Sequence, residues 1–233
     1  MSAAVEPRPA ATVVLLRDSA GGPEVLMVRR HRGSSFMADA YVFPGGRVEP
    51  EDGAGDAGFA VAAARELREE AAITIDAALL VPFAHWITPS AEGKRFDARF
   101  YLAPAPLGQL AQHDSVETVD SLWATPADML ARYERAELKL PPPTIRTLED
   151  LAAHATVAAA IAWARGREVA AILPKLVTVD DTIAIVLPWD PEYAALPGEG
   201  RALPAAHPAA RPPSRFVLRD GRWWGKPPTP PTP

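Results

Sequence analysis

The chain has 233 residues, which is enough for one substantial hydrophobic core or for a domain with an extension. Its formal net charge of −5 argues against nucleic acid and against an anionic membrane surface as partners. The absence of cysteine excludes disulfides, thiol nucleophiles and thiolate metal sites, and leaves oxygen or imidazole groups as metal ligands. No apolar run approaches the length of a membrane-spanning helix, and residues 1–10 lack a signal-peptide pattern, so we expect a cytoplasmic protein.

Two β-rich runs near the N-terminus, 12–17 and 24–30, flank a short turn sequence with two glycines and a proline. They predict an antiparallel pair of strands. The second run ends in the basic sequence Arg-Arg-His-Arg at 29–32. This run is either a solvated strand end or a set of contacts to a diphosphate, because arginine matches phosphate oxygens in a bidentate way.

A short strand over 41–43 leads into Pro44-Gly45-Gly46, where glycine allows the backbone to turn tightly. Ala, Leu, Glu and Arg then dominate the run 59–72, which predicts a helix. At 100° per residue, Glu69 and Glu70 lie about −60° and +40° from Glu66, so three carboxylates share one face.

Like charges at this spacing repel each other by about 0.2–0.5 kcal/mol per pair, even in water. A hard divalent cation would offset that repulsion, because Mg²⁺ and Mn²⁺ prefer oxygen ligands and are often held by a few carboxylates together with substrate phosphates. Taken alone, the spacing is more typical of a solvated acidic helix face. The surrounding sequence has to decide between the two interpretations.

Strands are also predicted over 79–87 and 95–102. Arg95, Asp97 and Arg99 alternate with aromatic residues on the second of these strands. Their shared face is either exposed to solvent or lines a substrate cleft.

A strand over 116–124 should lead into a helix that begins at Pro126, with Thr125 as its N-cap. In the last part of the chain, Thr147 is the expected cap of one helix. A second helix is predicted over 157–165. A hairpin is predicted around Asp220-Gly221, because this dipeptide favours two-residue turns.

The glycine loop and the acidic helix together resemble the signature of Nudix hydrolases, G-x5-E-x7-R-E-U-x-E-E-x-G-U, where U is aliphatic. Gly46 stands at the first glycine, and Asp52 stands where glutamate is usual. The run Arg-Glu-Leu-Arg-Glu-Glu at 65–70 matches the pattern position by position. The agreement of loop, order and all three helix carboxylates makes the resemblance specific.

Two departures from that pattern matter. Twelve residues, 53–64, separate Asp52 from Arg65, which is five more than the pattern has. We expect this spacer to loop out before the helix without moving the carboxylates. Ala72 replaces the second glycine. Alanine is easily tolerated there if the position is helical, and is costly only if the backbone must adopt a positive φ.

The resemblance implies an α/β fold, namely the Nudix α/β/α sandwich with a mixed sheet, plus a C-terminal α+β extension. The expected division is a Nudix domain over 1–135, an extension over 136–226 and a proline-rich tail over 227–233. We expect the extension to pack on the Nudix core, and a homodimer through a second copy is an open alternative.

The resemblance also implies hydrolysis of a nucleoside diphosphate derivative with Mg²⁺ or Mn²⁺ as cofactor. The implied metal ligands are Glu66, Glu69, Glu70 and Gly46. The implied catalytic residues are Glu69, Glu70 and Glu117, of which Glu70 or Glu117 is the base and Asp120 the reserve. The substrate-binding residues are Arg30, Arg95, Arg99, Gly45 and Gly46. Arg65 and Asp52 are structural, with Arg65 pairing with Asp52 or Glu69.

The Phe-Pro-Gly-Gly-Arg-Val loop, the long spacer and the later Trp-Ile-Thr-Pro sequence are similar to the Nudix branch that includes peroxisomal acyl-CoA diphosphatases. The Leu-Leu-Thr-x-Arg-Ser sequence of other CoA-cleaving members is absent. CoA or acyl-CoA is therefore the first expectation, and ADP-ribose, NADH, nucleotide sugars and dinucleoside polyphosphates stay open. A Nudix-fold nucleotide-binding or regulatory module with little catalysis is the alternative of another class; the intact carboxylates argue against it.

Overall fold

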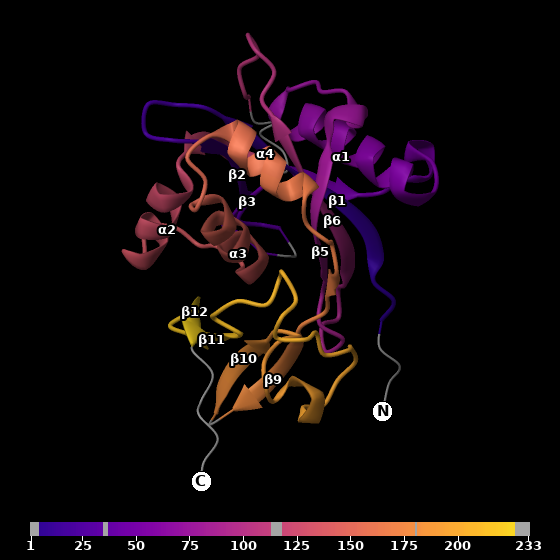
Figure 1. The fold of residues 1–233 in the computed structure, drawn as a ribbon, viewed down its shortest axis with the longest axis vertical. Coiled ribbons are helices and arrows are strands. Elements are labelled where there is room, and N and C mark those ends of the chain that lie inside the picture. Colours follow the sequence, from indigo (N-terminus) through magenta and orange to yellow (C-terminus); the bar gives the residue numbers. More distant parts are fainter. Residues whose placement is uncertain (1–4, 35–36, 113–117, 180, 227–233) are drawn as a thin grey trace. The chain divides into compact units, whose positions relative to one another are not determined.

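The computed structural model describes residues 5–34, 37–112, 118–179 and 181–226 (Figure 1). Glu117 and the tail 227–233 lie outside the described residues. Contacts divide the chain into two compact units. The large unit is Pro9–Ala84 with Ala98–Val169, and the small unit is Met1–Arg8, His85–Asp97 and Ala170–Pro233.

The large unit is built on a mixed sheet with the strand order β3-β2-β1-β6-β5, in which β4 also pairs with β1 and β7 with β2. The strands are β1 (Arg8–Arg17), β2 (Glu24–Arg30), β3 (Tyr41–Val42), β4 (Gly45–Arg47), β5 (Val81–Ile87), β6 (Phe96–Pro104) and β7 (Thr118–Ala124). The predicted antiparallel pair is confirmed, with Arg17 opposite Glu24. Ala105 N donates to Leu16 O (2.6 Å) and Arg8 N to Arg95 O (2.9 Å), which indicates that β1 and β6 run parallel.

One edge of β1 is shared by two strands. Its C-terminal end pairs with β2, whereas its N-terminal end pairs with β4, where Gly46 lies opposite Ala11 and Gly45 opposite Thr12. The backbones approach so closely that a Cβ on Gly45 would lie 2.4 Å from Ala11 O and 2.7 Å from Thr12 Cα. Glycine is therefore required where the chain passes from β3 to β4 and the sheet splits.

Helix α1 spans Gly55–Ala71, so it begins earlier than predicted. The expectation that the long spacer loops out is wrong, because ten of its twelve residues (55–64) are helical. Its alanines favour helix, and Ala62 and Ala63 are fully buried in the cluster that joins α1 to the sheet. The additional residues thus extend the helix and enlarge the core.

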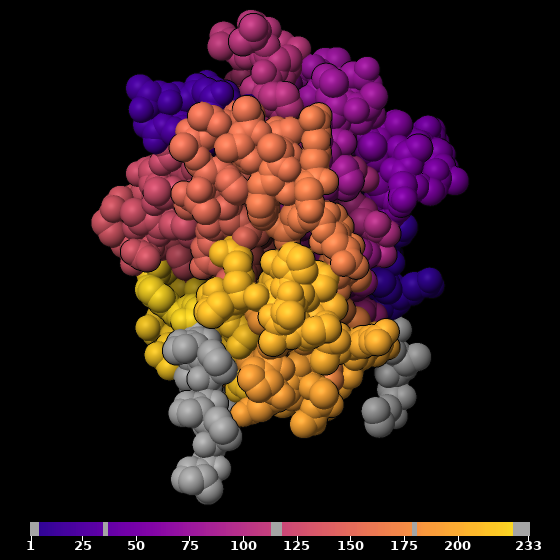
Figure 2. All heavy atoms as spheres, in the orientation of Figure 1, coloured from indigo at the N-terminus to yellow at the C-terminus, as the bar shows by residue number. Residues whose placement is uncertain are grey.

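The sheet lies between two helical layers. Ala11, Val13 and Leu15 of β1 pack in the cluster with α1, and Val14 and Leu16, which alternate with them, are buried on the other face. Figure 1 shows α1 on one side of these strands and α2 (Pro126–Glu134), α3 (Pro142–Leu151) and α4 (Val157–Arg165) on the other. The outer face of α4 forms part of the surface in Figure 2.

The N-terminal ends of these helices test the expected caps. Thr125 accepts a hydrogen bond from Asp128 N (3.2 Å), as predicted. The prediction that Thr147 caps a helix is wrong: Thr147 is buried inside α3, which begins with Pro142 at its first position, where proline needs no amide partner. Helix α4 has the predicted bounds and is capped by Thr156.

The boundary between the two units does not fall at residue 135, where the sequence analysis placed the end of the first domain. Helices α3 and α4 belong to the large unit. Val157 N at the start of α4 donates to Asp18 Oδ1 (2.8 Å), and the ring of Trp163 lies 6.2 Å from that of Phe83 on β5. The turn after β1 and a strand of the sheet therefore fix α4 to the large unit.

The small unit contains an antiparallel sheet with the order β12-β11-β10-β9. Its strands are β9 (Lys175–Val179), β10 (Thr182–Val186), β11 (Arg215–Arg219) and β12 (Arg222–Lys226), and β8 (Ala171–Ile172) pairs with the last residues of β5. The predicted hairpin is present: Asp220 and Gly221 both have positive φ, 51° and 71°, as its two-residue turn requires. None of the helices in the described ranges has the length and apolar character that crossing a membrane requires.

Buried charges in the small unit are closely paired. The Asp190 carboxylate accepts hydrogen bonds from Ser214 Oγ (2.7 Å) and from two nitrogens of Arg215 (2.6 Å each). Burial alone would raise the pKa of Asp190, but these bonds outweigh it and hold the pKa below its ordinary value. Lys175 is also buried, and its Nζ donates to Tyr193 O (2.9 Å) and Leu196 O (2.7 Å).

Candidate active site

The two glycines of β4 face two carboxylates of α1. Gly45 N donates a hydrogen bond to Glu70 Oε2 (3.0 Å). A Cβ on Gly46 would lie 2.4 Å from Glu66 Oε1, so the Glu66 carboxylate rests against the backbone there. The missing side chains let the helix carboxylates approach the strand, which is a physical reason for glycine at both positions.

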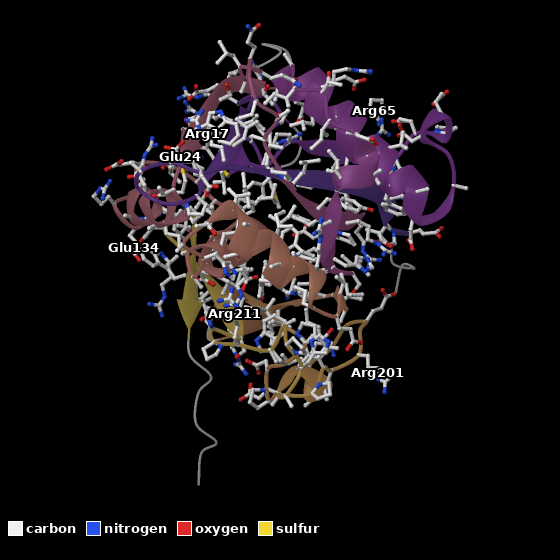
Figure 3. All side chains as sticks on the ribbon, turned by 45° about the horizontal axis from the view of Figure 1, so that its top comes forward. Arg17, Glu24, Arg65, Glu134, Arg201 and Arg211 are labelled. Carbon is white, nitrogen blue, oxygen red and sulfur yellow. The ribbon has the colours of Figure 1, made fainter. Side chains whose placement is uncertain are left out.

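Arg65 ties this arrangement together from α1 (Figure 3). It binds Asp52 through two parallel hydrogen bonds, Nε to Oδ1 (3.0 Å) and Nη2 to Oδ2 (2.9 Å). Its Nη1 donates to both Glu66 Oε1 (2.9 Å) and Glu69 Oε2 (3.0 Å), and its Nη2 donates to Arg47 O (2.9 Å). Both pairings expected of Arg65 are thus present, and they join the helix to β4 and to the turn before it.

Asp52 replaces the usual glutamate without losing the ion pair. It ends the short turn η1 (Pro50–Asp52) and accepts a further hydrogen bond from Glu49 N (2.8 Å). The hydrogen bonds from Arg65, opposed by burial, lower the pKa of Asp52, and Asp52 in turn raises the pKa of Arg65. The side chain of Asp52 is 3% exposed, so this pair is shielded from most solvent.

The three helix carboxylates differ in exposure. Glu70 is buried, the Glu66 side chain is 14% exposed and that of Glu69 is 49% exposed. No three Asp, Glu or His side chains of the described residues lie together in a metal-binding group. Glu66 and Glu69 both accept from Arg65 Nη1, whereas Glu70 Oε2 accepts from Gly45 N.

The donor set nevertheless fits a hard divalent cation in its chemistry. It offers carboxylates from one helix face and the backbone oxygens of a glycine strand, with no sulfur. Glu66 and Glu69 would exchange their shared Arg65 nitrogen for such a cation.

Thr118 is a site residue that the sequence did not reveal. This fully buried residue begins β7, and its hydroxyl donates to Glu70 O (3.4 Å). Arg30, at the end of β2, lies opposite Thr118, and the register of β7 shifts at this point. The strand pairing therefore brings Arg30 close to the C-terminal end of α1. Only the register could have shown this, because the contacts join residues far apart in sequence.

Asp120, the reserve candidate for the base, is engaged elsewhere. Its Oδ2 accepts a hydrogen bond from the hydroxyl of Tyr41 (2.6 Å). Burial and this hydrogen bond raise the pKa of Tyr41 to about 12, so the phenol remains a donor. We therefore keep Asp120 out of the proposed catalytic residues. Glu117 lies outside the described residues, so its role stays a prediction.

Arg95 is buried in the small unit, with 4% exposure. Its nitrogens donate to Thr88 O (3.0 Å) and Val5 O (2.6 Å), and one lies 3.4 Å from Glu199 Oε2. These contacts give Arg95 a structural role, and we leave it out of the proposed substrate contacts.

Arg99 stacks on the N-terminal half of α1. Its guanidinium lies 5.1 Å from the centre of the Phe59 ring and 3.9 Å from Asp56 Oδ1. Phe59 precedes Glu70 by eleven residues, or about 16 Å along the helix axis. The structure therefore does not bring Arg99 to the glycine strand, and its position fits anchoring of the extended helix better than contact with a diphosphate.

Ala72 ends α1 in the left-handed conformation, with φ 55° and ψ 26°, and its N–H donates to Arg68 O (3.0 Å). Alanine is therefore strained at this position, where the backbone has a positive φ, whereas glycine would adopt this conformation without a steric penalty.

Comparison with known families identifies the family to which this chain belongs. The NUDIX domain family matches residues 6–145, more than half of the chain, so the chain belongs to the Nudix family. Within that family it is a pyrophosphohydrolase, and hydrolases of the family act on nucleoside diphosphate derivatives and generally use divalent metal ions.

Solved structures support the fold. The chain is 27% identical to a NUDIX hydrolase from Alicyclobacillus acidocaldarius, covering 68% of this chain and 96% of that one, with a TM-score of 0.63. It is also similar to a Caenorhabditis elegans Ap4A hydrolase (25% identity, 63% and 98% coverage, TM-score 0.45). A third similar structure is the NUDIX domain of Shewanella oneidensis NrtR complexed with ADP ribose, with 17% identity over 62% of this chain and 86% of that one and a TM-score of 0.49. A comparison with curated proteins finds no match.

Proposed function

We propose that this chain is a divalent-metal-dependent hydrolase that cleaves the pyrophosphate of a nucleoside diphosphate linked to another group. The observation that supports it best is the meeting of helix carboxylates with the glycine strand: Glu70 on Gly45 N and Glu66 against Gly46. A helix face with this many like charges is retained most readily if it has a ligand.

Glu66, Glu69, Glu70 and a backbone oxygen of Gly46 would hold Mg²⁺ or Mn²⁺. When bound, such an ion neutralises phosphate charge and lowers the pKa of a water molecule. Arg65 keeps Glu66 and Glu69 together through one shared nitrogen, and its two bonds to Asp52 fix that nitrogen in place. The chain thus holds its ligands near each other before any cation arrives, which limits the reorganisation on binding.

Glu70 is our choice for the base that takes the proton of the attacking water. It is buried, and the hydrogen bond from Gly45 N fixes one carboxylate oxygen. A positioned base typically contributes about 10²- to 10⁴-fold to the rate. Glu117 is the alternative base. Arg30, near the C-terminal end of α1, would bind phosphate oxygens of the substrate.

For the substrate, CoA or acyl-CoA is the first candidate, and its support is the resemblance of the glycine loop and long spacer to the acyl-CoA diphosphatase branch. ADP-ribose, NADH, nucleotide sugars and dinucleoside polyphosphates are the others. The test is a screen of the purified full chain against this set with Mg²⁺ or Mn²⁺, with and without a chelator. A homodimer stays a prediction, which light scattering checks.

A nucleotide-binding module with little catalysis is the second candidate. One observation favours it: Ala72 stands where the signature has glycine and is held at φ 55°, so the end of the carboxylate helix departs from the catalytic pattern. The two candidates differ in turnover. A binding module would hold nucleotide without releasing products in the presence of either metal.

Glu69→Gln and Glu70→Gln test the mechanism. We expect each to lower kcat by at least about 10²-fold, because each removes a metal-binding charge and the second also removes the base. Thermal unfolding should stay close to that of the parent, since glutamine can still accept the same hydrogen bonds. Glu168→Gln, an exposed glutamate outside the site, is the matched control. Parental rates in both site variants would refute the mechanism.

A further inference from the structure

A glycine lies near the beginning of α1, inside the spacer that separates Asp52 from Arg65. Gly58 is the fourth residue of the helix and is buried. Glycine is less favourable than alanine inside a helix, and alanine is the commonest residue of this spacer. A specific contact must therefore account for the missing side chain at this position.

The contact is with the backbone of the turn that carries Asp52. A Cβ on Gly58 would lie 2.4 Å from Gly53 O and 2.8 Å from Gly53 C. Gly53 follows Asp52 directly and has φ 92°, so the chain folds back over the first turn of α1 at this point. Because the atoms in contact belong to the backbone, no side-chain rotation could relieve the clash, and the turn itself would have to move.

Gly58 and Arg65 lie on the same face of α1. They are seven residues apart, so they differ by about 20° in direction and by about 10 Å along the helix axis. The turn contacts this face at Gly58, and on the same face Asp52 accepts the two hydrogen bonds from Arg65 (3.0 and 2.9 Å). The approach of the turn at Gly58 therefore sets the distance that the Asp52 side chain has to span.

This close approach explains how aspartate can replace the glutamate of the Nudix signature at residue 52. One methylene lengthens a side chain by up to about 1.5 Å, the length of one carbon–carbon bond. With alanine at residue 58, the distance from its Cβ to the turn would have to increase from 2.4 Å to about 3.5 Å, so the turn would move away by about 1 Å. The two lengths are similar, so the missing side chain of Gly58 offsets the missing methylene of Asp52.

We propose that Gly58 is a positioning residue, matched to Asp52, for the metal-binding carboxylates. By letting the turn lie close to α1, Gly58 keeps Asp52 within reach of Arg65. The Nη1 of Arg65 in turn donates to both Glu66 and Glu69. This inference rests on the proposed function and gives a residue of the spacer a part in it. Groups that orient metal ligands from outside typically contribute about 10- to 100-fold to metal affinity or activity.

A double-mutant cycle of Gly58→Ala and Asp52→Glu tests the match without turnover. Thermal unfolding is measured on the metal-free full chain for the parent, both single variants and the double variant. Each single change should lower the Tm by about 4 °C, because the first displaces the turn and the second crowds a longer side chain beneath an unmoved turn. The double variant should regain most of this loss, because the longer side chain spans the wider gap.

Gly166→Ala is the matched control. Its added Cβ would lie 3.6 Å from Ala162 O, which is an ordinary contact distance, so the Tm should change by less than about 1 °C.

The second measurement is Mn²⁺ binding by the same proteins, followed through the electron paramagnetic resonance signal of free Mn²⁺. We expect each single variant to bind Mn²⁺ about tenfold more weakly than the parent. The double variant should recover to within about threefold of the parent, and the control should bind as the parent does. The kcat/KM for the substrate found in the screen should follow the same order.

Three outcomes separate this inference from the proposed function. Losses that add in the double variant, both in Tm and in Mn²⁺ affinity, would overturn the inference, whereas turnover by the parent would leave the hydrolase intact. Recovery of the Tm without recovery of Mn²⁺ affinity would also overturn it, because Gly58 would then serve stability alone. Recovery of the Tm, with a parent that neither binds Mn²⁺ nor releases products, would refute the proposed function and leave the match of Gly58 with Asp52 standing.

Discussion

The two units of this chain bury charge in different ways. In the small unit, Asp190 is matched by the two nitrogens of Arg215 and by Ser214, so its buried charge is compensated inside the protein. In the large unit, Glu66 and Glu69 share a single nitrogen of Arg65, whose other bonds go to Asp52 and a backbone carbonyl. Arg215 is also shared, since Glu192 lies 2.7 Å from it, but Asp190 is fully buried and both of its oxygens are bonded. On the helix face, by contrast, the Glu69 side chain is half exposed, and its second cationic neighbour, Arg68, lies 3.7 Å away.

This difference separates groups that serve stability from groups that serve binding. Removing one partner of a matched pair leaves the other charge buried and uncompensated, which is strongly destabilising. Removing one of several like charges relieves repulsion and costs little stability. Variants of Asp190 and of the helix glutamates should therefore have opposite effects on unfolding and on turnover. Three further changes measure what a matched charge pair in each unit, and the end of α1, contribute to stability.

Asp190→Ala should have the largest effect on stability. The Asp190 side chain is fully buried, so its loss leaves the buried Arg215 with only the half-exposed Glu192 as a charged partner and should cost about 3 kcal/mol. Urea unfolding followed by circular dichroism measures this. The control Glu92→Gln, at an exposed residue of the same unit, should change stability by less than about 0.5 kcal/mol. Comparable stability of the two variants would contradict a stabilising role for the buried Asp190–Arg215 pair.

Asp52→Asn should have an intermediate effect that depends on pH. The pKa of Asp52 is lowered in the folded state, so its charge adds stability above its ordinary value of 3.8, and this contribution is lost as the pH falls. We expect the variant to be about 2 kcal/mol less stable at pH 7, and the difference to shrink below about pH 4. Unfolding curves at several pH values check this, with Glu51→Gln, an exposed residue of the same short turn, as the control. A difference independent of pH would contradict the assignment.

Ala72→Gly should have the smallest effect, and in the opposite direction. Alanine is held at φ 55°, where glycine is not penalised, so the variant should be more stable by about 1 kcal/mol. Ala136→Gly, at another alanine with positive φ (63°) but outside the site, should gain a similar amount. Ala57→Gly, inside α1, should lose stability. Thermal unfolding of the three variants measures the order, and a loss at Ala72 would show that our reading of this helix end is wrong.

Much of the fold followed from local signals in the sequence. The turn at Asp220-Gly221, the cap at Thr125 and the bounds of α4 depend on neighbouring residues only, and they were predicted correctly. The pairing of Arg65 with Asp52 was also expected, because the order of the signature places the two residues in one motif.

The remaining features depend on contacts between distant residues. Thr118 lies 48 residues from Glu70, and Lys139 lies 100 residues from Asp39, so only the sheet register brings these pairs together. Arg95 resembled a cleft residue because its strand alternates, yet its partners include a carbonyl 90 residues away. The spacer was misjudged because its glycines suggested a loop, whereas its alanines found a sheet to pack against.

The helical spacer has a consequence for how this chain can change its length. Because residues 55–64 continue directly into the carboxylate turns, inserting or deleting one residue there would rotate everything before it by about 100°. Phe59 would then leave Arg99, and Ala62 and Ala63 would leave the sheet. The helix can therefore gain or lose residues only in whole turns. A change of about seven residues, or two full turns, keeps the same side chains facing the sheet. With other changes, the additional residues would have to loop out of the helix as a bulge.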